Sequence, residues 1–366
     1  MTAYDIAVVG GGAVGAAIAY GLVRGGATVA MLDEGDVAFR AARGNFGIVW
    51  VQGKGLDAPH YARWTRLSSD LWPDYAAELE AATGVALGYA RPGGVEFCLG
   101  EGEWTAREAE MRRLREQSGG RFRYEMLDRE GLADLVPRLG PEVFGGSYSP
   151  LDGHVNPLYL LRALHAAFIA EGGRYLPEAP VAAIEFDGRG FTLRSAKQTV
   201  SAGRVVLAAG FGSRDLAPQV GLAAPLEPIR GQILVTEKLA PFLRLPTAFV
   251  RQTAEGGCLL GDSHEEVGFD DGTTRAVMGA IARRALATFP CLGSVRVVRA
   301  WGALRVMTPD GLPIYEASES CPGAYLASSH SGITLAAAHS LRLADWIAGG
   351  EPPPDLAAFA SERFDD

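Results

Sequence analysis

The chain has 366 residues, of which 48% are hydrophobic, enough apolar side chains for one large domain or for two interleaved domains with substantial cores. A net charge of −9 without a dense block of Lys and Arg excludes the basic surface of a nucleic-acid-binding protein. No apolar run approaches the roughly 20 residues of a membrane span, and the 4 widely spaced cysteines form no Cys-x-x-Cys pair, which argues against a metal site or a thiol redox motif.

The first element along the chain is a unit of strand, turn, helix and strand at 4–35. Its apolar run 6–9 predicts a buried strand, and Gly10-Gly11-Gly12-Ala13-Val14-Gly15 then follows the spacing G-x-G-x-x-G. In this motif the first glycine allows a tight turn, the second lets a pyrophosphate approach the backbone, and the third lets helix and strand pack closely. A helix is predicted at 16–23, and the strand after it ends at Asp33, whose carboxylate is placed to accept hydrogen bonds from both hydroxyls of a ribose. The unit predicts a dinucleotide site and leaves NAD and FAD open.

The position of this unit also bears on localisation. No basic segment precedes its first strand, so the strand is not expected to be cleaved as part of a signal peptide. We therefore expect a cytoplasmic protein without a membrane span.

The middle of the chain alternates between helical and extended patterns. The segment 34–47 is too rich in glycine for a core helix and too long for a simple turn. Apolar residues at helical spacing predict a helix at 59–83, and Glu and Arg at the spacings of a solvated helix predict one at 103–117. Helices are also predicted at 128–135, 158–170 and 274–287, and Asn156 before Pro157 is a helix-cap signal. Short β-branched or aromatic runs predict strands at 94–99, 181–186, 191–195, 204–209, 229–236, 248–253, 258–260 and 295–301. The strands within 181–209 are expected to form a meander that rejoins a sheet.

The last unit repeats the logic of the first. A strand is predicted at 324–327, a turn at 328–332 and a helix at 333–347. The N-terminus of this helix is expected to face a bound group, because free backbone N–H groups and the helix dipole favour negative charge there.

Taken in order, these segments resemble the FAD-dependent amine oxidoreductases of the D-amino acid oxidase family, which includes glycine oxidase, sarcosine oxidase and D-amino acid dehydrogenase. The resemblance covers nearly the whole chain. Besides the glycine motif with Asp33, it is carried by 205–210, 228–232, 301–313 and 329–334. More narrowly, the loop 43–55 is similar to the flavin-side loop of the β subunits of opine and hydroxyproline dehydrogenases.

The resemblance implies an α/β fold in which the chain passes repeatedly between two domains. A Rossmann-like, FAD-binding domain of the glutathione-reductase type is expected at 1–48, 146–227 and 300–366. An antiparallel-sheet substrate domain, expected at 49–145 and 228–299, would be interleaved with it. Substrate would bind between the two.

The resemblance also implies which residues hold the cofactor. The loop after Arg43 would approach the flavin, Val181 would face adenine, and backbone N–H groups near His330 would stabilise the negative charge of reduced flavin. FAD is expected to be non-covalent, because the cysteine that bonds flavin in sarcosine oxidase is replaced by Ala303. The full predicted set is Gly10, Gly12, Ala13, Val14, Gly15, Asp33, Glu34, Arg43, Gly44, Asn45, Phe46, Gly47, Ile48, Val181, Ala209, Gly210, Arg305, His330, Ser331, Gly332, Ile333 and Thr334.

Arg305 and His330 are the predicted catalytic residues. The family places an arginine at the position of Arg305 to bind the α-carboxylate of the substrate, and a planar guanidinium does this through two parallel hydrogen bonds. Arg230 is more often a structural brace in this family. For His330, contact with substrate and a purely structural role both remain open.

Three functional hypotheses follow. In the first, the protein oxidises the Cα–N bond of a small carboxylated amine by hydride transfer to flavin N5, and water hydrolyses the imine. The loop resemblance favours secondary amines such as N-carboxyalkyl amino acids, glycine derivatives or D-hydroxyproline. In the second, it is a 2-hydroxy acid dehydrogenase that uses His330 as base. In the third, it is the FAD-carrying subunit of a multi-subunit dehydrogenase, so a homo-oligomer and partner subunits both stay open.

Overall fold

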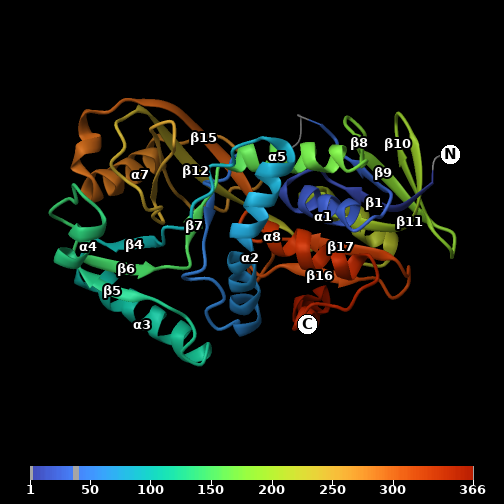
Figure 1. Ribbon diagram of the computed structural model, residues 1–366, viewed down its shortest axis with the longest axis horizontal. Helices are drawn as coiled ribbons and strands as arrows, with labels where there is room; N and C mark the ends of the chain where they lie inside the picture. Colours follow the sequence, from blue (N-terminus) through green and yellow to red (C-terminus); the bar gives the residue numbers. More distant parts are fainter. Residues whose placement is uncertain (1–2, 36–40, 366) are drawn as a thin grey trace.

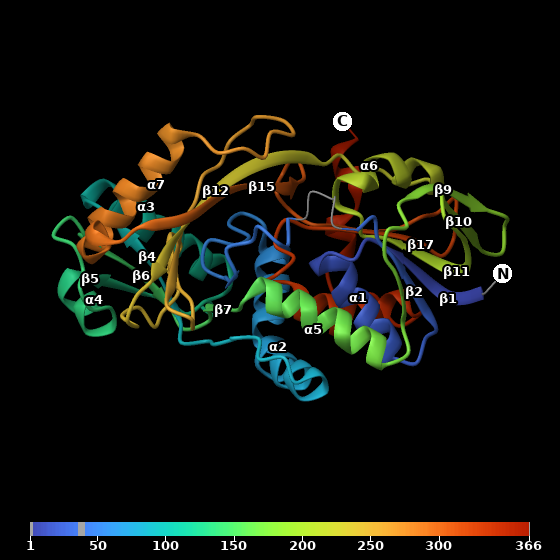
Figure 2. The same cartoon turned by 90° about the horizontal axis from the view of Figure 1, so that it is seen from above.

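A computed structural model describes residues 3–35 and 41–365. The molecule is elongated, with a parallel sheet at one end, antiparallel sheets at the other, and the long strands β12 and β15 running between them (Figures 1 and 2). Residues 36–40, which belong to the segment 34–47 expected to be irregular, lie outside the described residues.

The parallel sheet is organised around β1 (Ala3–Val9), which pairs with β2 (Val29–Leu32) on one side and with β11 (Thr199–Leu207) on the other. β8 (Arg174–Leu176) extends the sheet beyond β2, and β17 (Ala324–Ser328) extends it beyond β11, followed by the antiparallel β16 (Ile314–Ala317). Because a central parallel strand is buried on both faces, the run 6–9 is apolar throughout. The predicted meander is confirmed. β10 (Phe191–Ser195) pairs antiparallel with β9 (Val181–Phe186) on one side and with β11 on the other.

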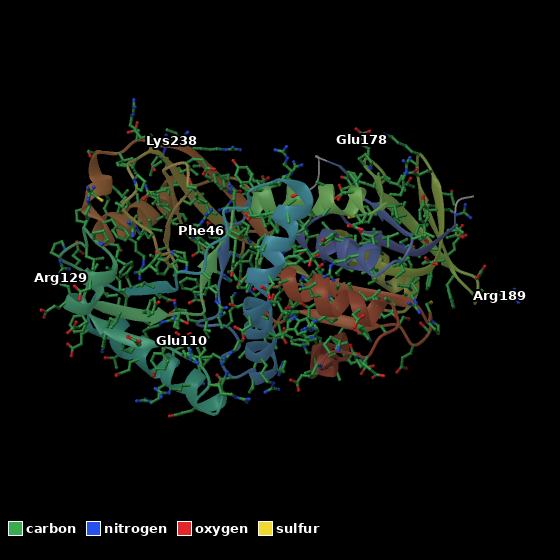
Figure 3. All side chains as sticks on the ribbon, in the orientation of Figure 1. Phe46, Glu110, Arg129, Glu178, Arg189 and Lys238 are labelled. Carbon is green, nitrogen blue, oxygen red and sulfur yellow. The ribbon has the colours of Figure 1, made fainter. Side chains whose placement is uncertain are left out.

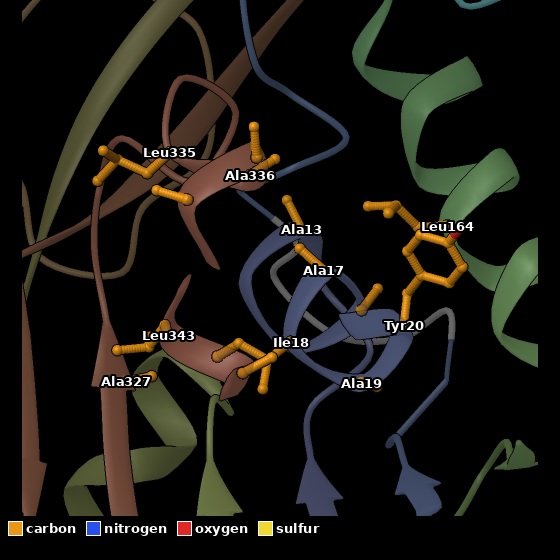
Figure 4. Close-up of a cluster of buried hydrophobic side chains, with 14 of the residues drawn as sticks. Ala13, Ala17, Ile18, Ala19, Tyr20, Leu164, Ala327, Leu335, Ala336 and Leu343 are labelled. Atoms are coloured by element: carbon orange, nitrogen blue, oxygen red, sulfur yellow. The ribbon is translucent and has the colours of Figure 1, made fainter. Parts of the chain in front are cut away.

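Helices cover one face of this sheet. Ile6 and Val8 of β1 pack in a cluster with α1 (Ala13–Arg24), α2 (Pro59–Thr83), α5 (Pro157–Ala170) and the closing helical segment 336–347. Figure 4 shows part of this cluster, with Ile18 and Tyr20 of α1 between Leu343 and Leu164. Gly21 lets α1 approach the closing segment, because a Cβ there would lie 2.1 Å from the Ser340 oxygen. The other face of β1 packs with β9, β10 and the short segment from α6 (Ser213–Leu216) to η2 (Ala217–Val220).

The antiparallel region is built on β12 (Glu227–Lys238), which pairs along its length with β15 (Val297–Met307). The same sheet continues through β14 (Gly257–Leu260) and β13 (Val250–Gln252), with α7 (Arg275–Thr288) packed against β12. A three-stranded sheet of β4 (Gly94–Cys98), β6 (Gly145–Ser149) and β5 (Glu125–Asp128) carries α3 (Glu101–Gln117) and α4 (Arg129–Leu135). The remaining elements are β3 (Ile48–Val49), β7 (Gly153–His154), η1 (Gly210–Gly212), η3 (Pro290–Ser294), η5 (Leu356–Phe359) and η6 (Ser361–Phe364).

This arrangement confirms the predicted α/β fold class, with a parallel sheet and antiparallel sheets formed by interleaved segments. The domain boundaries expected from the sequence stay a prediction. Within residues 3–35 and 41–365, no helix combines the length and the apolar character needed to cross a lipid bilayer.

The helix ends predicted from a terminal glycine or an asparagine cap are confirmed for α2 and α5. α2 ends before Gly84, whose φ of +67° is the left-handed conformation that favours glycine after a helix. At the start of α5, the Asn156 side chain accepts a hydrogen bond from Leu158 N at 3.0 Å.

The closing helix begins later than predicted. The helical segment starts at α8 (Ala336–Ala338), not at residue 333, and continues through the π-helical η4 (His339–Leu343) to α9 (Ala344–Ile347). The Thr334 carbonyl accepts hydrogen bonds from Ser68 Oγ (2.7 Å) and Trp72 Nε1 (2.9 Å) of α2. The Ala338 amide, which would bond that carbonyl in an α-helix, donates to Ser68 Oγ at 3.2 Å instead. Side chains of α2 thus keep 331–335 in a turn.

Candidate functional site

A cavity of about 410 Å³ lies at the carboxyl ends of β1, β2, β11 and β17. Ligands of open parallel sheets bind at this edge, where backbone turns leave the sheet. The predicted site residues that line this large cavity are Gly10, Gly12, Ala13, Val14, Asp33, Glu34, Asn45, Val181, Ala209, Gly210, His330, Gly332 and Ile333.

The glycines of the first turn have different roles in this cavity. Gly10 has a φ of +107°, and a Cβ there would lie 2.3 Å from the Ala208 oxygen. A Cβ on Gly15 would lie 1.9 Å from the Gly10 oxygen, so this glycine serves close packing of α1 on β1. A Cβ on Gly12, in contrast, would meet no described protein atom within 4 Å, and Gly12 lines the cavity. The open space at Gly12 is what a pyrophosphate on the backbone requires.

Polar atoms at the same edge complete the fit to a dinucleotide. The buried Asp33 carboxylate accepts hydrogen bonds from Gly11 N (2.7 Å) and Gly35 N (2.8 Å), and Asp33 lines the large cavity. Ser328 Oγ is buried in the cavity lining, and no hydrogen-bond partner is found for it in the part of the chain that the structure describes. Such an atom needs a partner that the described protein atoms do not supply, either a ligand or a water.

A second cavity, of about 180 Å³, adjoins the first, since Ala41, Asn45, His330 and Ile333 line both. It lies where the parallel-sheet region meets β12 and β15, near Phe46, which is labelled in Figure 3. The predicted site residues that line this small cavity are Gly44, Asn45, Phe46, Ile48, Arg305, His330, Ser331, Ile333 and Thr334.

Arg305 is a fixed cation in the small cavity. It lies on β15 opposite Ile229 of β12, and its Nη1 donates to the Ser263 carbonyl at 2.8 Å. Asp262 pairs with the other terminal nitrogen. The guanidinium lies over Gly231, where a Cβ would come within 2.6 Å of both terminal nitrogens. The glycine therefore makes room for the arginine, whose guanidinium is held in place by Asp262 and Ser263.

His330 is paired with a residue that the sequence did not identify. Lys54 Nζ lies 3.0 Å from His330 Nε2, and both residues line the small cavity. Burial and the nearby cations Lys54 and Arg305 hold the pKa of His330 well below its ordinary value, so the ring is neutral and Lys54 is the donor. Burial and Arg305 also lower the pKa of Lys54 to about 8.

Hydrogen bonds continue from His330 into the core. Ser331 Oγ lies 3.0 Å from His330 Nε2 and accepts a hydrogen bond from Tyr61 OH at 2.8 Å. The loop before Lys54 is tied to the same turn, because Trp50 N donates to Thr334 Oγ1 at 3.2 Å. The predicted turn residues 330–334 are thus brought together with the loop 43–55.

Three predicted cofactor residues, Gly15, Arg43 and Gly47, are not among the described residues that line either cavity. Gly47 supports the loop, since its φ is +86° and a Cβ would lie 2.5 Å from the Val155 oxygen. Arg230, expected to be a brace, pairs with Glu265 (2.8 Å) and Asp270. Of the residues missed, Lys54 had a signal in its neighbours Gly53 and Gly55, whose positive φ angles turn the loop.

Residues 5–346 match the family described as FAD dependent oxidoreductase. The chain belongs to this family. It is 44% identical to a subunit of opine oxidase from Agrobacterium tumefaciens (strain Ach5) over 361 residues, which cover 98% of this chain and 97% of the relative. Glycine oxidase of Geobacillus kaustophilus (strain HTA426) is 28% identical over 98% of this chain and 97% of its own length. A crystal structure of glycine oxidase from Geobacillus kaustophilus superposes with a TM-score of 0.91 at 26% identity, covering 98% of both chains.

Membership of the FAD dependent oxidoreductase family confirms the predicted family and enzyme class, an FAD-dependent amine or amino-acid oxidoreductase. It also confirms the fold predicted from that resemblance, an FAD-binding parallel sheet with an antiparallel substrate sheet. FAD is thereby implied as the cofactor, and the large cavity has the backbone turn and the acidic residue that its dinucleotide part requires.

Proposed function

We propose that the protein oxidises the Cα–N bond of an N-substituted amino acid, with Arg305 binding the α-carboxylate. The observation that carries this proposal is the position of Arg305: a fixed guanidinium in a small cavity that adjoins the nucleotide cavity. FAD, when bound, supplies the acceptor for the hydride that leaves Cα. A carboxylated amine anchored at Arg305 would present its Cα toward that neighbouring site.

The residues of the chain contribute positioning and electrostatics. Two parallel hydrogen bonds from Arg305 fix the carboxylate, and a fixed geometry lowers the entropic part of the barrier. Residues of the turn 330–334 line the two cavities, and backbone N–H groups of this turn would stabilise negative charge there. A neutral secondary amine needs no acid or base to lose hydride. Water then hydrolyses the imine, releasing a 2-oxo acid and an amine.

N-carboxyalkyl amino acids are the substrates we place first. The relative with 44% identity belongs by its name to an opine oxidase, and opines are compounds of this chemical class. Glycine derivatives come second, because the glycine oxidases share the fold at lower identity. D-hydroxyproline is the third class proposed.

FAD is proposed to be non-covalent. Ala303 lines the small cavity, and by the family resemblance it stands in place of the flavin-linked cysteine of sarcosine oxidase. Cys98, Cys258, Cys291 and Cys321 are not among the described residues that line either cavity. Denaturation with trichloroacetic acid should therefore leave all flavin colour in the supernatant.

Partner subunits are also proposed, because the relative at 44% identity is named as one subunit of its enzyme. If this chain needs partners, the isolated chain should reduce its flavin with substrate and turn over slowly with external acceptors. Size-exclusion chromatography of the chain expressed alone and with its genomic neighbours would distinguish this arrangement from a homo-oligomer.

The test of the proposed reaction is anaerobic reduction of bound FAD. Iminodiacetate, N-(1-carboxyethyl) amino acids, sarcosine and D-hydroxyproline are added to the holoprotein, and loss of flavin absorbance is followed in a stopped-flow instrument. At least one secondary amine should bleach the flavin, and 2-hydroxy acids of matched length should not. Bleaching by the hydroxy acids alone would overturn the proposal.

The 2-hydroxy acid hypothesis has less support from the site geometry. It requires His330 as a base for the hydroxyl proton, and His330 Nε2 already accepts a hydrogen bond from Lys54 Nζ. A nitrogen whose lone pair is engaged is a poor proton acceptor.

A further inference from the structure

Lys54 is held in the small cavity by a loop with little freedom. Its neighbours Gly53 and Gly55 have φ angles of +83° and +72°, and its own amide donates to the Val51 carbonyl at 3.1 Å. A Cβ on Gly55 would lie 2.3 Å from Ala62 N, so the loop lies close against α2. The side chain of Lys54 therefore starts from a defined backbone position.

A buried polar network holds the same loop from the other side. The Asp152 carboxylate, fully buried, accepts hydrogen bonds from Val51 N and from Gln52 Nε2 (2.7 Å). Gln52 Oε1 in turn accepts from Arg107 Nη2 at 2.8 Å and from Ser147 Oγ at 2.7 Å. Each partner is anchored on a separate element, so the loop is fixed before any ligand arrives.

The ammonium of Lys54 has unused hydrogen-bonding capacity. An ammonium carries three N–H donors, and the one acceptor found for Nζ within residues 3–35 and 41–365 is His330 Nε2. No carboxylate in this part of the chain lies within ion-pair distance of Lys54. Burial and the charge of Arg305 disfavour the protonated form of Lys54 and lower its pKa to about 8. At neutral pH it is still mostly protonated, so its role is that of a cation and not of a proton acceptor.

The charges that line the small cavity are unbalanced. Arg305 and Lys54 are positive and Asp262 is negative, and no other charged side chain is found among the described residues of the lining. One positive charge is therefore left over. With the amine in the same protonation state, an N-carboxyalkyl amino acid carries one negative charge more than an amino acid with a single carboxylate.

We propose that Lys54 binds a second carboxylate of the substrate, on the far side of the reacting nitrogen from the carboxylate at Arg305. The inference rests on the proposed amine oxidation and gives it a specificity residue. The site then prefers dicarboxylic secondary amines to N-alkyl amino acids of the same length. His330 orients Lys54 by accepting one of its hydrogen bonds.

Two matched ligand pairs test this proposal on the FAD-loaded protein. Thiodiacetate and (methylthio)acetate cannot be oxidised at a C–N bond and differ by one carboxylate; their binding is measured by calorimetry and by perturbation of the flavin spectrum. Iminodiacetate and sarcosine form the corresponding pair of reactive amines. The proteins compared are wild type, Lys54→Met, Lys54→Arg and Lys238→Met, which removes an exposed lysine at the end of β12 (Figure 3).

Lys54→Met should weaken thiodiacetate binding by about 10- to 100-fold and (methylthio)acetate binding by less than about threefold, the range expected for one lost charge-assisted contact. Lys54→Arg should keep most of the preference, and Lys238→Met should match wild type. The proposal is overturned if wild type binds both ligands equally, or if Lys54→Met weakens both by the same factor. Absence of bleaching by all the secondary amines of the panel described above, with the thiodiacetate preference intact, would sink the proposed oxidation and leave the role of Lys54 standing.

Discussion

The two adjoining cavities are built from different materials. The large cavity is lined mainly by glycine, alanine and aliphatic residues, many of them in the turns that follow β1, β2, β11 and β17. The small cavity is lined by the charged groups Lys54, Arg305 and Asp262, which come from three separate loops and strands. In the turn at the large cavity, tight backbone packing at Gly10 and Gly15 leaves no room for added side-chain atoms. In the small cavity, Lys54 is a cation without a carboxylate partner among the described residues.

This difference sets what each cavity can tolerate. A Cβ added at Gly10 or Gly15 of the nucleotide turn would clash, because backbone oxygens would lie 2.3 Å and 1.9 Å from it. In the small cavity the shape can be kept while a charge is removed, and the cost then falls on ligand binding. Substitutions in the first should affect folding and FAD, and those in the second should affect substrate alone.

The largest effect is expected for Gly10→Ala. A Cβ would lie 2.3 Å from the Ala208 oxygen at a φ of +107°, so both backbone strain and a backbone clash oppose it. We expect the free energy of unfolding of the apoprotein to fall by more than ~2 kcal/mol, measured by urea denaturation.

Gly12→Ala is the matched control for that substitution. Its Cβ would meet no described protein atom within 4 Å, so the apoprotein should unfold like wild type. FAD affinity should nevertheless fall, because the methyl group occupies space offered to the pyrophosphate. Equal destabilisation by both substitutions would contradict the division of roles between these glycines.

Arg305→Met should have the next largest effect. Loss of a charge-assisted, bidentate contact predicts a fall of about 10- to 100-fold in kcat/KM for every carboxylated amine, with FAD affinity unchanged. Arg299→Met is the control, since Arg299 is exposed and lies over the Trp301 ring at 5.4 Å. Normal kcat/KM in Arg305→Met would contradict the proposal that Arg305 binds the α-carboxylate.

Asp152→Asn tests whether the buried network positions Lys54. The amide introduced by Asp152→Asn would have one oxygen acceptor in place of two, so it could not accept from both Val51 N and Gln52 Nε2 in the present geometry. We expect a loss of about 1 to 3 kcal/mol of stability and a several-fold loss of the preference for thiodiacetate. Asp355→Asn, at a surface pair with Arg63, should cost less than ~1 kcal/mol and leave the preference intact.

The sequence predicted the nucleotide turn well because its parts follow one another along the chain. Strand, glycines, helix and Asp33 all fall within 4–35, so spacing alone relates them. Lys54 could not be assigned in this way: its partner His330 is 276 residues away, and only the fold brings the two together.

Strand β6 and the start of the closing helix were not predicted correctly from the sequence for the same physical reason. β6, with the sequence Gly-Gly-Ser-Tyr-Ser, has weak strand propensity, and it pairs closely with β4 because Gly146 leaves room for the Glu96 carbonyl. The start of the closing helix was predicted three residues early because Ser68 and Trp72, distant in sequence, take its first hydrogen bonds. Contacts between distant segments override local propensity at these points.

The smallest effect expected is a pH dependence that belongs to Lys54. Its free-state pKa is about 8, and a bound carboxylate would raise it, so the complex holds more protons than the free protein above that pH. Thiodiacetate affinity should therefore fall as pH rises from 8 to 9, by no more than about tenfold per unit. The groups facing Lys54 are His330, neutral throughout this range, and the charged Arg305 and Asp262.

Two variants at residue 54 test whether Lys54 is the group that titrates. Lys54→Arg should bind thiodiacetate with little change in affinity between pH 8 and 9, and Lys54→Met should bind it weakly at every pH. A decline in affinity that persists in both variants would assign the titration to another group.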